Sequence, residues 1–113
     1  MHEYSIISSL LEHVAAEARA RNATAVHRVT VRIGIAAGVE PELLSSAYEL
    51  FRAGTICASA ELCVERVEER WVCPGCGRTV ERGAVLSCEG CGMTTRLVSG
   101  DEIILERIEM EVP

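Results

Sequence analysis

Four of the six cysteines in this chain stand in two Cys-x-x-Cys pairs, Cys73 with Cys76 and Cys88 with Cys91. Each pair runs on into a glycine, and the two-residue gap lets both sulfurs of a pair point into one concavity. Four thiolates from two such knuckles make a closed tetrahedral site that suits zinc, with Zn–S distances of about 2.3 Å. Because all four ligands come from the protein, no position is left for water or substrate. We therefore expect a structural Zn(II).

A second arrangement that can bind a metal stands at the start of the chain, Met1-His2-Glu3. The His2 imidazole, its own backbone amide and the Met1 amine can all close chelate rings on a single ion. Nitrogen-rich, near-planar ligation of that kind suits Ni(II) or Cu(II) better than zinc. A bulky second residue disfavours removal of the initiator methionine, so we expect the amine to stay one residue from the imidazole. By itself, however, a histidine near a chain start is most often part of a solvated end.

Other interpretations of the cysteines and histidines stay open at this point. The knuckle thiols could be unrelated buried residues, or one pair could be a redox-active dithiol, but the doubled spacing favours a metal site. Cys57 and Cys63 lie outside that spacing and are interpreted as small apolar core residues. His13 and His27 are interpreted as structural or solvated side chains rather than ligands.

Size and charge limit what the chain can be. Its 113 residues suffice for one modest core, and a net charge of −6, with no lysine at all, disfavours nucleic-acid binding. No apolar run approaches the roughly 20 residues that span a bilayer, and the start lacks a secretory-signal pattern. The sequence also contains no phosphate-binding loop motif. Six cysteines without a signal peptide point to a reducing compartment, so we expect the protein to be cytoplasmic.

The elements that must position these residues follow from hydrophobic periodicity. Helical spacing extends from Ser5, a predicted N-cap, to about Arg21, and a second helix is predicted between Pro41 and Gly54. Alternation predicts strands over 27–35, 61–71 and 103–112. In the first strand, Thr30 is expected on the face opposite the apolar one. The first helix should bury Ile7, Leu10, Leu11, Val14 and Ala18, and the second Leu43, Leu44, Ala47, Leu50 and Phe51.

This order of elements predicts an α+β fold, in which two helices pack on a small three-stranded, mostly antiparallel sheet. A zinc-ribbon-like module is inserted before the last strand. We expect two domains, an α/β domain over 1–70 plus 98–113 that carries the nickel site, and a zinc-binding module over 71–97. A module of that size buries too little apolar surface to fold alone, so metal ligation must stabilise it.

Three separated motifs occur together and in a fixed order. They are the start Met-His-Glu-Tyr-Ser, the segment Val-Arg-Ile-Gly-Ile-Ala-Ala-Gly-Val-Glu-Pro-Glu, and the paired knuckles followed by Gly100-Asp101-Glu102. In this combination the whole chain resembles the HypA/HybF family, the nickel-insertion accessory proteins for [NiFe]-hydrogenases.

The resemblance implies a metallochaperone and not an enzyme. In that family the histidine at the second position is the nickel ligand, here His2, and the acidic residue after it, here Glu3, contributes its backbone amide. Glu40 matches a position that is aspartate in some relatives and is implicated there near the nickel site. The four knuckle cysteines match the family's zinc ligands.

The predicted function is therefore binding of Ni(II) at the amino terminus, through His2, Glu3, the Met1 amine and Glu40, and delivery of nickel for maturation of [NiFe]-hydrogenase. Nickel is the transferable ion, and zinc has a structural or sensing role. Implied partners are a HypB-type accessory GTPase and the hydrogenase large-subunit precursor, and exposed sheet edges would suit a homodimer. Two rival classes remain, a zinc-ribbon interaction adaptor without transferable metal and a thiol oxidoreductase.

Overall fold

A computed structural model describes residues 2–80, 87–88 and 90–113. The chain divides into two compact units. The first consists of Met1–Arg32, Val39–Glu65 and Ile104–Pro113, and the second of Ile33–Gly38 and Arg66–Ile103. The predicted metal module at 71–97 lies within the second unit, and its folding as a separate domain stays a prediction.

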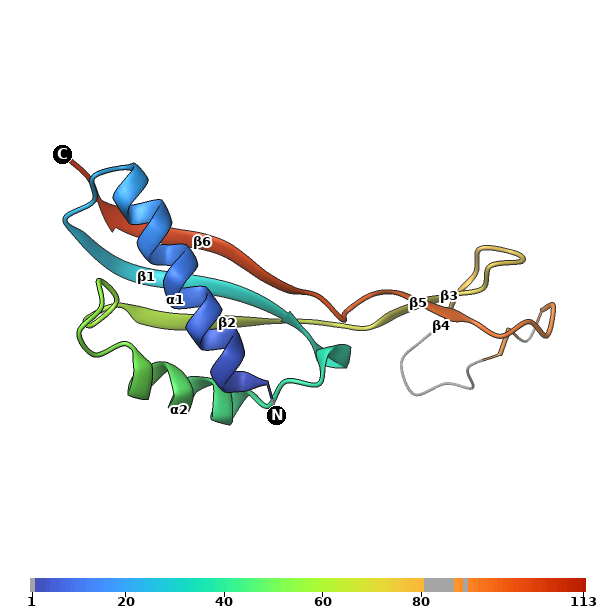
Figure 1. The fold of residues 1–113 in the computed structure, drawn as a ribbon. Helices are drawn as coiled ribbons and strands as arrows, with labels where there is room; N and C mark the ends of the chain where they lie inside the picture. Colours follow the sequence, from blue (N-terminus) through green and yellow to red (C-terminus); the bar gives the residue numbers. More distant parts are fainter. Residues whose placement is uncertain (1, 81–86, 89) are drawn as a thin grey trace. The chain divides into compact units, whose positions relative to one another are not determined.

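Helix α1 spans Glu3–Ala20 and crosses the sheet of the first unit (Figure 1). The predicted apolar stripe of this helix is confirmed, because Ile7, Leu10, Leu11, Val14 and Ala18 are all buried. The predicted N-cap at Ser5 is wrong. The N-cap is His2, three residues earlier, and the His2 carbonyl accepts a hydrogen bond from the Ile6 N–H at 2.9 Å.

The main sheet has the strand order β2-β1-β6, formed by β1 (Ala25–Gly34), β2 (Glu61–Val67) and β6 (Ile103–Glu111). Strands β1 and β6 are antiparallel, since Thr24 N–H donates to Glu111 O and Gly34 N–H donates to Glu102 O, both at 2.8 Å. Strand β2 runs in the same direction as β1 (Figure 1), and the helix between them provides the crossover connection that parallel neighbours need. The sheet is therefore mixed, with one antiparallel and one parallel pairing, whereas a mostly antiparallel sheet was predicted.

The central strand β1 supplies much of the core. Val29, Val31 and Ile33 are buried as predicted, but Thr30 is also only 2% exposed. A central strand has a neighbour on each side, so a small side chain on its outer face can be covered by the longer side chains around it. Arg28 and Arg32 on that face form ion pairs with β2 and β6, Arg28 with Glu61 and Glu109 and Arg32 with Glu106.

Helix α2 spans Pro41–Phe51, between β1 and β2. Leu44 and Ala47 are buried as predicted, together with Tyr48. The prediction is wrong for Leu43, Leu50 and Phe51, which are exposed by 52%, 63% and 41%. Leu44, Ala47 and Tyr48 stand at i, i+3 and i+4 and form one stripe, whereas Leu43 and Leu50 form a second stripe beside it. Only the first stripe faces the core.

The second unit contains a small sheet of its own that was not predicted from the sequence. Its strand order is β4-β3-β5, with β3 at Arg70–Val72, β4 at Thr79–Val80 and β5 at Arg96–Ser99. Both pairings are antiparallel, with Trp71 opposite Val80 on one side and Leu97 on the other. The predicted strand over 61–71 is therefore split, because β2 ends at Val67 and Arg70–Val72 belongs to the second sheet.

Two glycines in the second unit allow close backbone approach. The segment after β1 is a short 3-10 helix, η1 (Ile35–Ala37), whose Ala36 N–H donates to Gly100 O at 2.7 Å. A Cβ at Gly34 would collide with the backbone carbonyl of Gly100, and Gly100 itself has a φ of +102°. Glycine is required at both positions, at the first for space and at the second for conformation.

The predicted fold class is confirmed, with two helices, a three-stranded sheet and an inserted four-cysteine module. Among the described helices, none combines the length and the apolar character needed to cross a bilayer.

Candidate metal centres

The two knuckles are built by the same backbone hydrogen bonds. In each, the N–H of the first cysteine donates to the carbonyl five residues later at 2.9 Å. The glycine four residues after that cysteine donates back to the cysteine carbonyl, and it has a positive φ in both knuckles. These glycines are Gly77, with a φ of +75°, and Gly92, with a φ of +71°. The turn chemistry that the sequence predicted is thus present twice, and it directs both sulfurs of each knuckle to one side.

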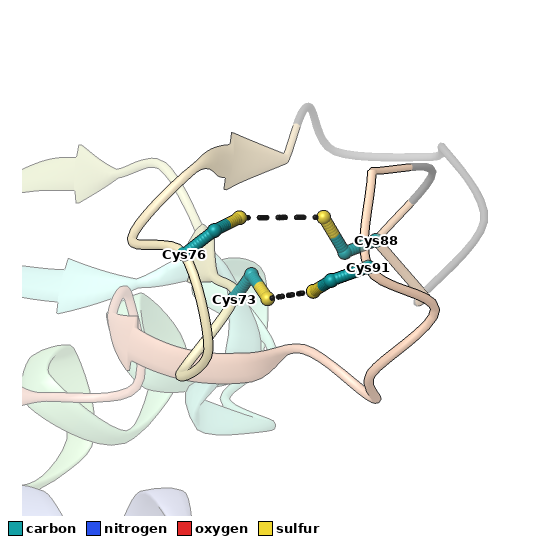
Figure 2. Close-up of side chains that lie close together, drawn as sticks. All are labelled: Cys73, Cys76, Cys88 and Cys91. Carbon is teal, nitrogen blue, oxygen red and sulfur yellow. Dashed lines mark hydrogen bonds between the residues drawn. The ribbon is translucent and has the colours of Figure 1, made fainter.

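The four knuckle sulfurs converge (Figure 2). The Cys73 and Cys91 sulfurs lie 3.1 Å apart, the Cys76 and Cys88 sulfurs 3.5 Å apart, and all four lie within 4.8 Å of one another. A tetrahedral ion with Zn–S bonds of about 2.3 Å would separate its sulfurs by about 3.8 Å. The donor set and its dimensions therefore fit a zinc ion.

Local hydrogen bonds prepare two of these thiols to ionise. The backbone N–H of Cys91, the Cys76 thiol and the backbone N–H of Gly90 together lower the pKa of Cys88 to about 6. The Cys91 thiol and then the backbone N–H of Cys76 lower the pKa of Cys73. Within the close pair the proton stays on Cys91, because its hydrogen bond to Cys73 raises the pKa of Cys91 to about 11. Since metals bind thiolates, Cys73 and Cys88 are the two cysteines of the cluster whose lowered pKa favours the metal-binding form.

The candidate nickel residues lie in the first unit, at the start of α1. His2 is exposed in the N-cap position, whereas Glu3 is only 3% exposed. Glu40 is the N-cap residue of α2, and its backbone N–H donates to Glu3 Oε2 at 2.9 Å. The structure thus brings Glu3 and Glu40 together through the backbone of Glu40, while the Met1 amine falls outside the described residues.

The carboxylate of Glu3 is a part of this region that sequence reasoning missed, because only the backbone amide of that residue was expected to take part. Nothing in the spacing pointed to the contact, since the two partners are 37 residues apart. Within the described part of the chain, the four cysteines form the one cluster of three or more metal-binding side chains. A site made from a single imidazole and backbone nitrogens would not form such a cluster.

The remaining histidines and cysteines lie as structural or solvated side chains. His13 is exposed, with Nε2 3.9 Å from Glu17 Oε1, and His27 is exposed, with Nε2 2.9 Å from Glu111 Oε1. Cys57 is fully buried, and Cys63 is half-buried with its thiol 3.5 Å from Glu61 Oε1. Burial is the main reason that the pKa of each of these two thiols is raised. Neither cysteine belongs to the four-sulfur cluster.

Known proteins resemble this chain over its whole length. A family model described as "Hydrogenase/urease nickel incorporation, metallochaperone, hypA" matches residues 1–110. The hydrogenase maturation factor HypA of Aquifex aeolicus is 40% identical over 114 residues, which cover 99% of each chain. The corresponding factor of Shewanella oneidensis is 40% identical over 115 residues, covering 98% of this chain and 96% of the relative.

Solved structures agree with the sequence relatives. The solution structure of the Ni metallochaperone HypA from Helicobacter pylori matches with a TM-score of 0.74 and 30% identity, covering 100% of both chains. A second HypA solution structure matches with a TM-score of 0.78 and 31% identity, covering 97% of this chain and 96% of that one. The family expected from the sequence motifs, a metallochaperone rather than an enzyme, is confirmed. The chain belongs to the HypA family of nickel-incorporation metallochaperones for hydrogenase maturation.

Proposed function

We propose that this chain binds Ni(II) at its amino terminus and delivers it to a [NiFe]-hydrogenase precursor. The observation that carries the proposal is the exposed His2 at the N-cap of α1, next to a Glu3 that is buried and hydrogen-bonded to α2. The imidazole of His2, the backbone nitrogens of His2 and Glu3, and the Met1 amine would be the ligands. An exposed imidazole beside a fixed backbone lets the ion bind and leave.

The start of a helix suits ligation by backbone nitrogen. The first N–H groups of a helix have no intrahelical acceptor, so binding a metal through the nitrogens of His2 and Glu3 breaks no helical hydrogen bond. Nickel must displace a proton from each amide that it binds, and the positive end of the helix dipole stabilises the resulting negative nitrogen. The imidazole must be neutral to bind, so nickel affinity should fall in acid.

Glu40 acts on this site chiefly through its backbone. Its N–H holds the Glu3 carboxylate, and that bond ties the start of α1 to the start of α2. The Glu40 side chain is exposed, which leaves it able to reach a bound ion as an additional ligand. We propose the backbone role as the main one.

The four knuckle cysteines would hold a structural zinc. When bound, the ion supplies a crosslink between the two knuckle turns. Thiolates from the two knuckles fill the coordination sphere, so this site would not serve as the place where nickel is exchanged.

The partners follow from the family's role in maturation. We propose that a HypB-type GTPase and the hydrogenase large-subunit precursor bind this chain in the cytoplasm, with a homodimer as a further assembly. The family description also names urease, so a urease precursor is a second candidate acceptor of the nickel.

The test is a Ni(II) titration of untagged protein with its native amino terminus, beside His2→Ala and His13→Ala. His13 is the matched control, because it is an exposed histidine on the same helix. We expect one nickel per chain for the wild type and for His13→Ala, no tight nickel for His2→Ala, and equal zinc in all three. Equal nickel binding by His2→Ala would overturn the proposal and favour a zinc-ribbon adaptor.

A further inference from the structure

In each knuckle, the glycine directly before the second cysteine lies next to a side chain of the other knuckle. A Cβ at Gly75 would lie 2.5 Å from the Met93 sulfur, and a Cβ at Gly90 would lie 3.3 Å from the Arg78 guanidinium. Met93 and Arg78 occupy equivalent places, each five residues after the first cysteine of its own knuckle. Their carbonyls accept the hydrogen bonds from Cys88 N–H and Cys73 N–H. Each knuckle thus places one side chain next to the other knuckle, a thioether from Met93 and a guanidinium from Arg78.

Gly75 is not required by its backbone conformation. Gly77 and Gly92 have positive φ, but Gly75 is not among the positive-φ residues. A side chain at Gly75 would therefore be free of backbone strain, and what it would meet is the Met93 thioether. Glycine at this position provides the space that Met93 occupies.

The Met93 thioether lies near the sulfurs of Cys73 and Cys91. The same Cβ at Gly75 would lie 3.5 Å from the Cys91 sulfur and 3.7 Å from the Cys73 sulfur, and those two sulfurs are 3.1 Å apart. Cys91 is exposed and Cys73 is buried, so a reagent in solvent reaches this pair of sulfurs from the Cys91 side. Met93 is itself 47% exposed, so its side chain lies at the surface near this pair of sulfurs.

We infer that Met93 is a covering residue of the metal site, which limits the access of competing chelators and thiol reagents to Cys91 and Cys73. A thioether is apolar, flexible and polarisable, so it packs against sulfur without adding charge to the cluster. Arg78 cannot act in the same way on its side, because a guanidinium is hydrated and attracts anionic chelators. The inference rests on the proposed zinc site at the four cysteines and is independent of the nickel site.

The experiment compares zinc-loaded wild type with Met93→Ala, Met93→Leu, Gly75→Ala and Gly90→Ala, all as full chains. The first measurement is the rate of zinc transfer to the chelator 4-(2-pyridylazo)resorcinol. The second is the rate at which N-ethylmaleimide alkylates each cysteine, located by mass spectrometry. Met93→Ala removes the cover, whereas Gly75→Ala displaces it while leaving the thioether in the chain.

We expect zinc transfer about tenfold faster in Met93→Ala and Gly75→Ala, the size of effect that residues around metal ligands have. Alkylation should accelerate at Cys91 and Cys73 and not at Cys76. Met93→Leu preserves the bulk of the side chain, so its rate should stay within about twofold of the wild type. Gly90→Ala should also change little, since only the end of a flexible arginine must move.

Three results would overturn the inference. They are an unchanged rate in Met93→Ala, a rate in Met93→Leu as fast as in Met93→Ala, and an equal acceleration by Gly90→Ala, which would indicate general loosening of the knuckles. A wild type that binds less than one zinc per chain would instead overturn the proposed zinc site, so the two failures are distinguishable.

Discussion

The buried carboxylate of Glu3 accepts a hydrogen bond from the backbone N–H of Glu40, with 2.9 Å between Oε2 and N. This bond joins the first residue of α1 to the N-cap residue of α2. Hydrogen bonds to its carboxylate, including the one from the Glu40 N–H, lower the pKa of Glu3 to about 2. Glu3 therefore stays ionised at neutral pH. Its hydrogen bond with Glu40 holds the start of α1 in place, next to His2 of the proposed nickel site.

Replacing Glu3 by glutamine should weaken nickel binding without removing a nickel ligand. The amide side chain of Glu3→Gln would keep an oxygen acceptor but lose the charge that strengthens the hydrogen bond from the Glu40 N–H. We expect nickel affinity to fall about tenfold, in line with residues that orient metal ligands, and zinc content to stay constant. Titration calorimetry measures the change. Glu42→Gln, at an exposed acid in the first turn of α2, is the control and should bind nickel like the wild type.

The same carboxylate should make the first unit sensitive to acid. Its pKa lies below that of an unfolded glutamate, about 4.3, so ionised Glu3 stabilises the fold above that pH. This stabilisation is lost as the pH falls from about 4.3 towards about 2. The melting temperature of Glu3→Gln, followed by far-UV circular dichroism, should therefore approach that of the wild type across this window. A constant difference between the two proteins across the window would contradict the assignment.

The four-cysteine cluster could be predicted from sequence because its determinants are local. Two residues between cysteines and a glycine after each pair specify the turn, so the convergence of four sulfurs followed from spacing alone. The contact between Glu3 and Glu40 could not be predicted, because it depends on how two helices meet. The small β3–β5 sheet was missed for a related reason. Strands as short as Thr79–Val80 carry no alternation to read.

Loss of one zinc ligand should unfold the second unit and leave the helices intact. We expect Cys73→Ser to retain no zinc, because three thiolates do not close the site and the cluster stabilises a segment with little apolar core. Limited trypsin digestion should then cut within 66–103, while far-UV circular dichroism keeps the signal of α1 and α2. Cys63→Ser is the matched control, since Cys63 lies outside the cluster, and it should keep one zinc per chain. Loss of helical signal together with zinc would show that the two units fold as one.

Two side chains at the end of α2 donate hydrogen bonds to the same carbonyl, so the losses of stability caused by replacing them should not be additive. The buried Ala60 carbonyl accepts hydrogen bonds from Tyr48 Oη at 2.9 Å and from Arg52 Nη1 at 2.7 Å. Tyr48→Phe should cost about 1 kcal/mol of unfolding free energy, because Arg52 still satisfies the carbonyl. The double variant with Arg52→Ala leaves the carbonyl unsatisfied and should lose more than the sum of the single changes, by about 1 kcal/mol or more. Urea denaturation of the four proteins in the cycle measures this coupling, and simple additivity would argue against it.

The orientation of α2 was the main feature of the first unit that hydrophobicity misassigned. Its apolar residues occupy two adjacent stripes, and sequence alone does not determine which of them turns inward. Tyr48 was not among the predicted core residues, yet it is 1% exposed, with its hydroxyl donating a hydrogen bond to Ala60 O. Phe51 was expected in the core and instead packs its ring edge-on against Tyr4, with 5.4 Å between the ring centroids. Contacts that form only in the folded state determine which of the two stripes is buried.

Two leucines of α2 give a direct test of this orientation. Leu44 is 1% exposed and Leu50 is 63% exposed, although they share a helix and a residue type. Leu44→Ala should therefore lower the unfolding free energy by about 2–5 kcal/mol, through lost burial and the cavity that remains. Leu50→Ala should change it by no more than about 0.5 kcal/mol, since its side chain is already in water. Urea unfolding followed by circular dichroism compares the two. Equal losses would mean that α2 presents both stripes to the core, as the hydrophobic pattern first indicated.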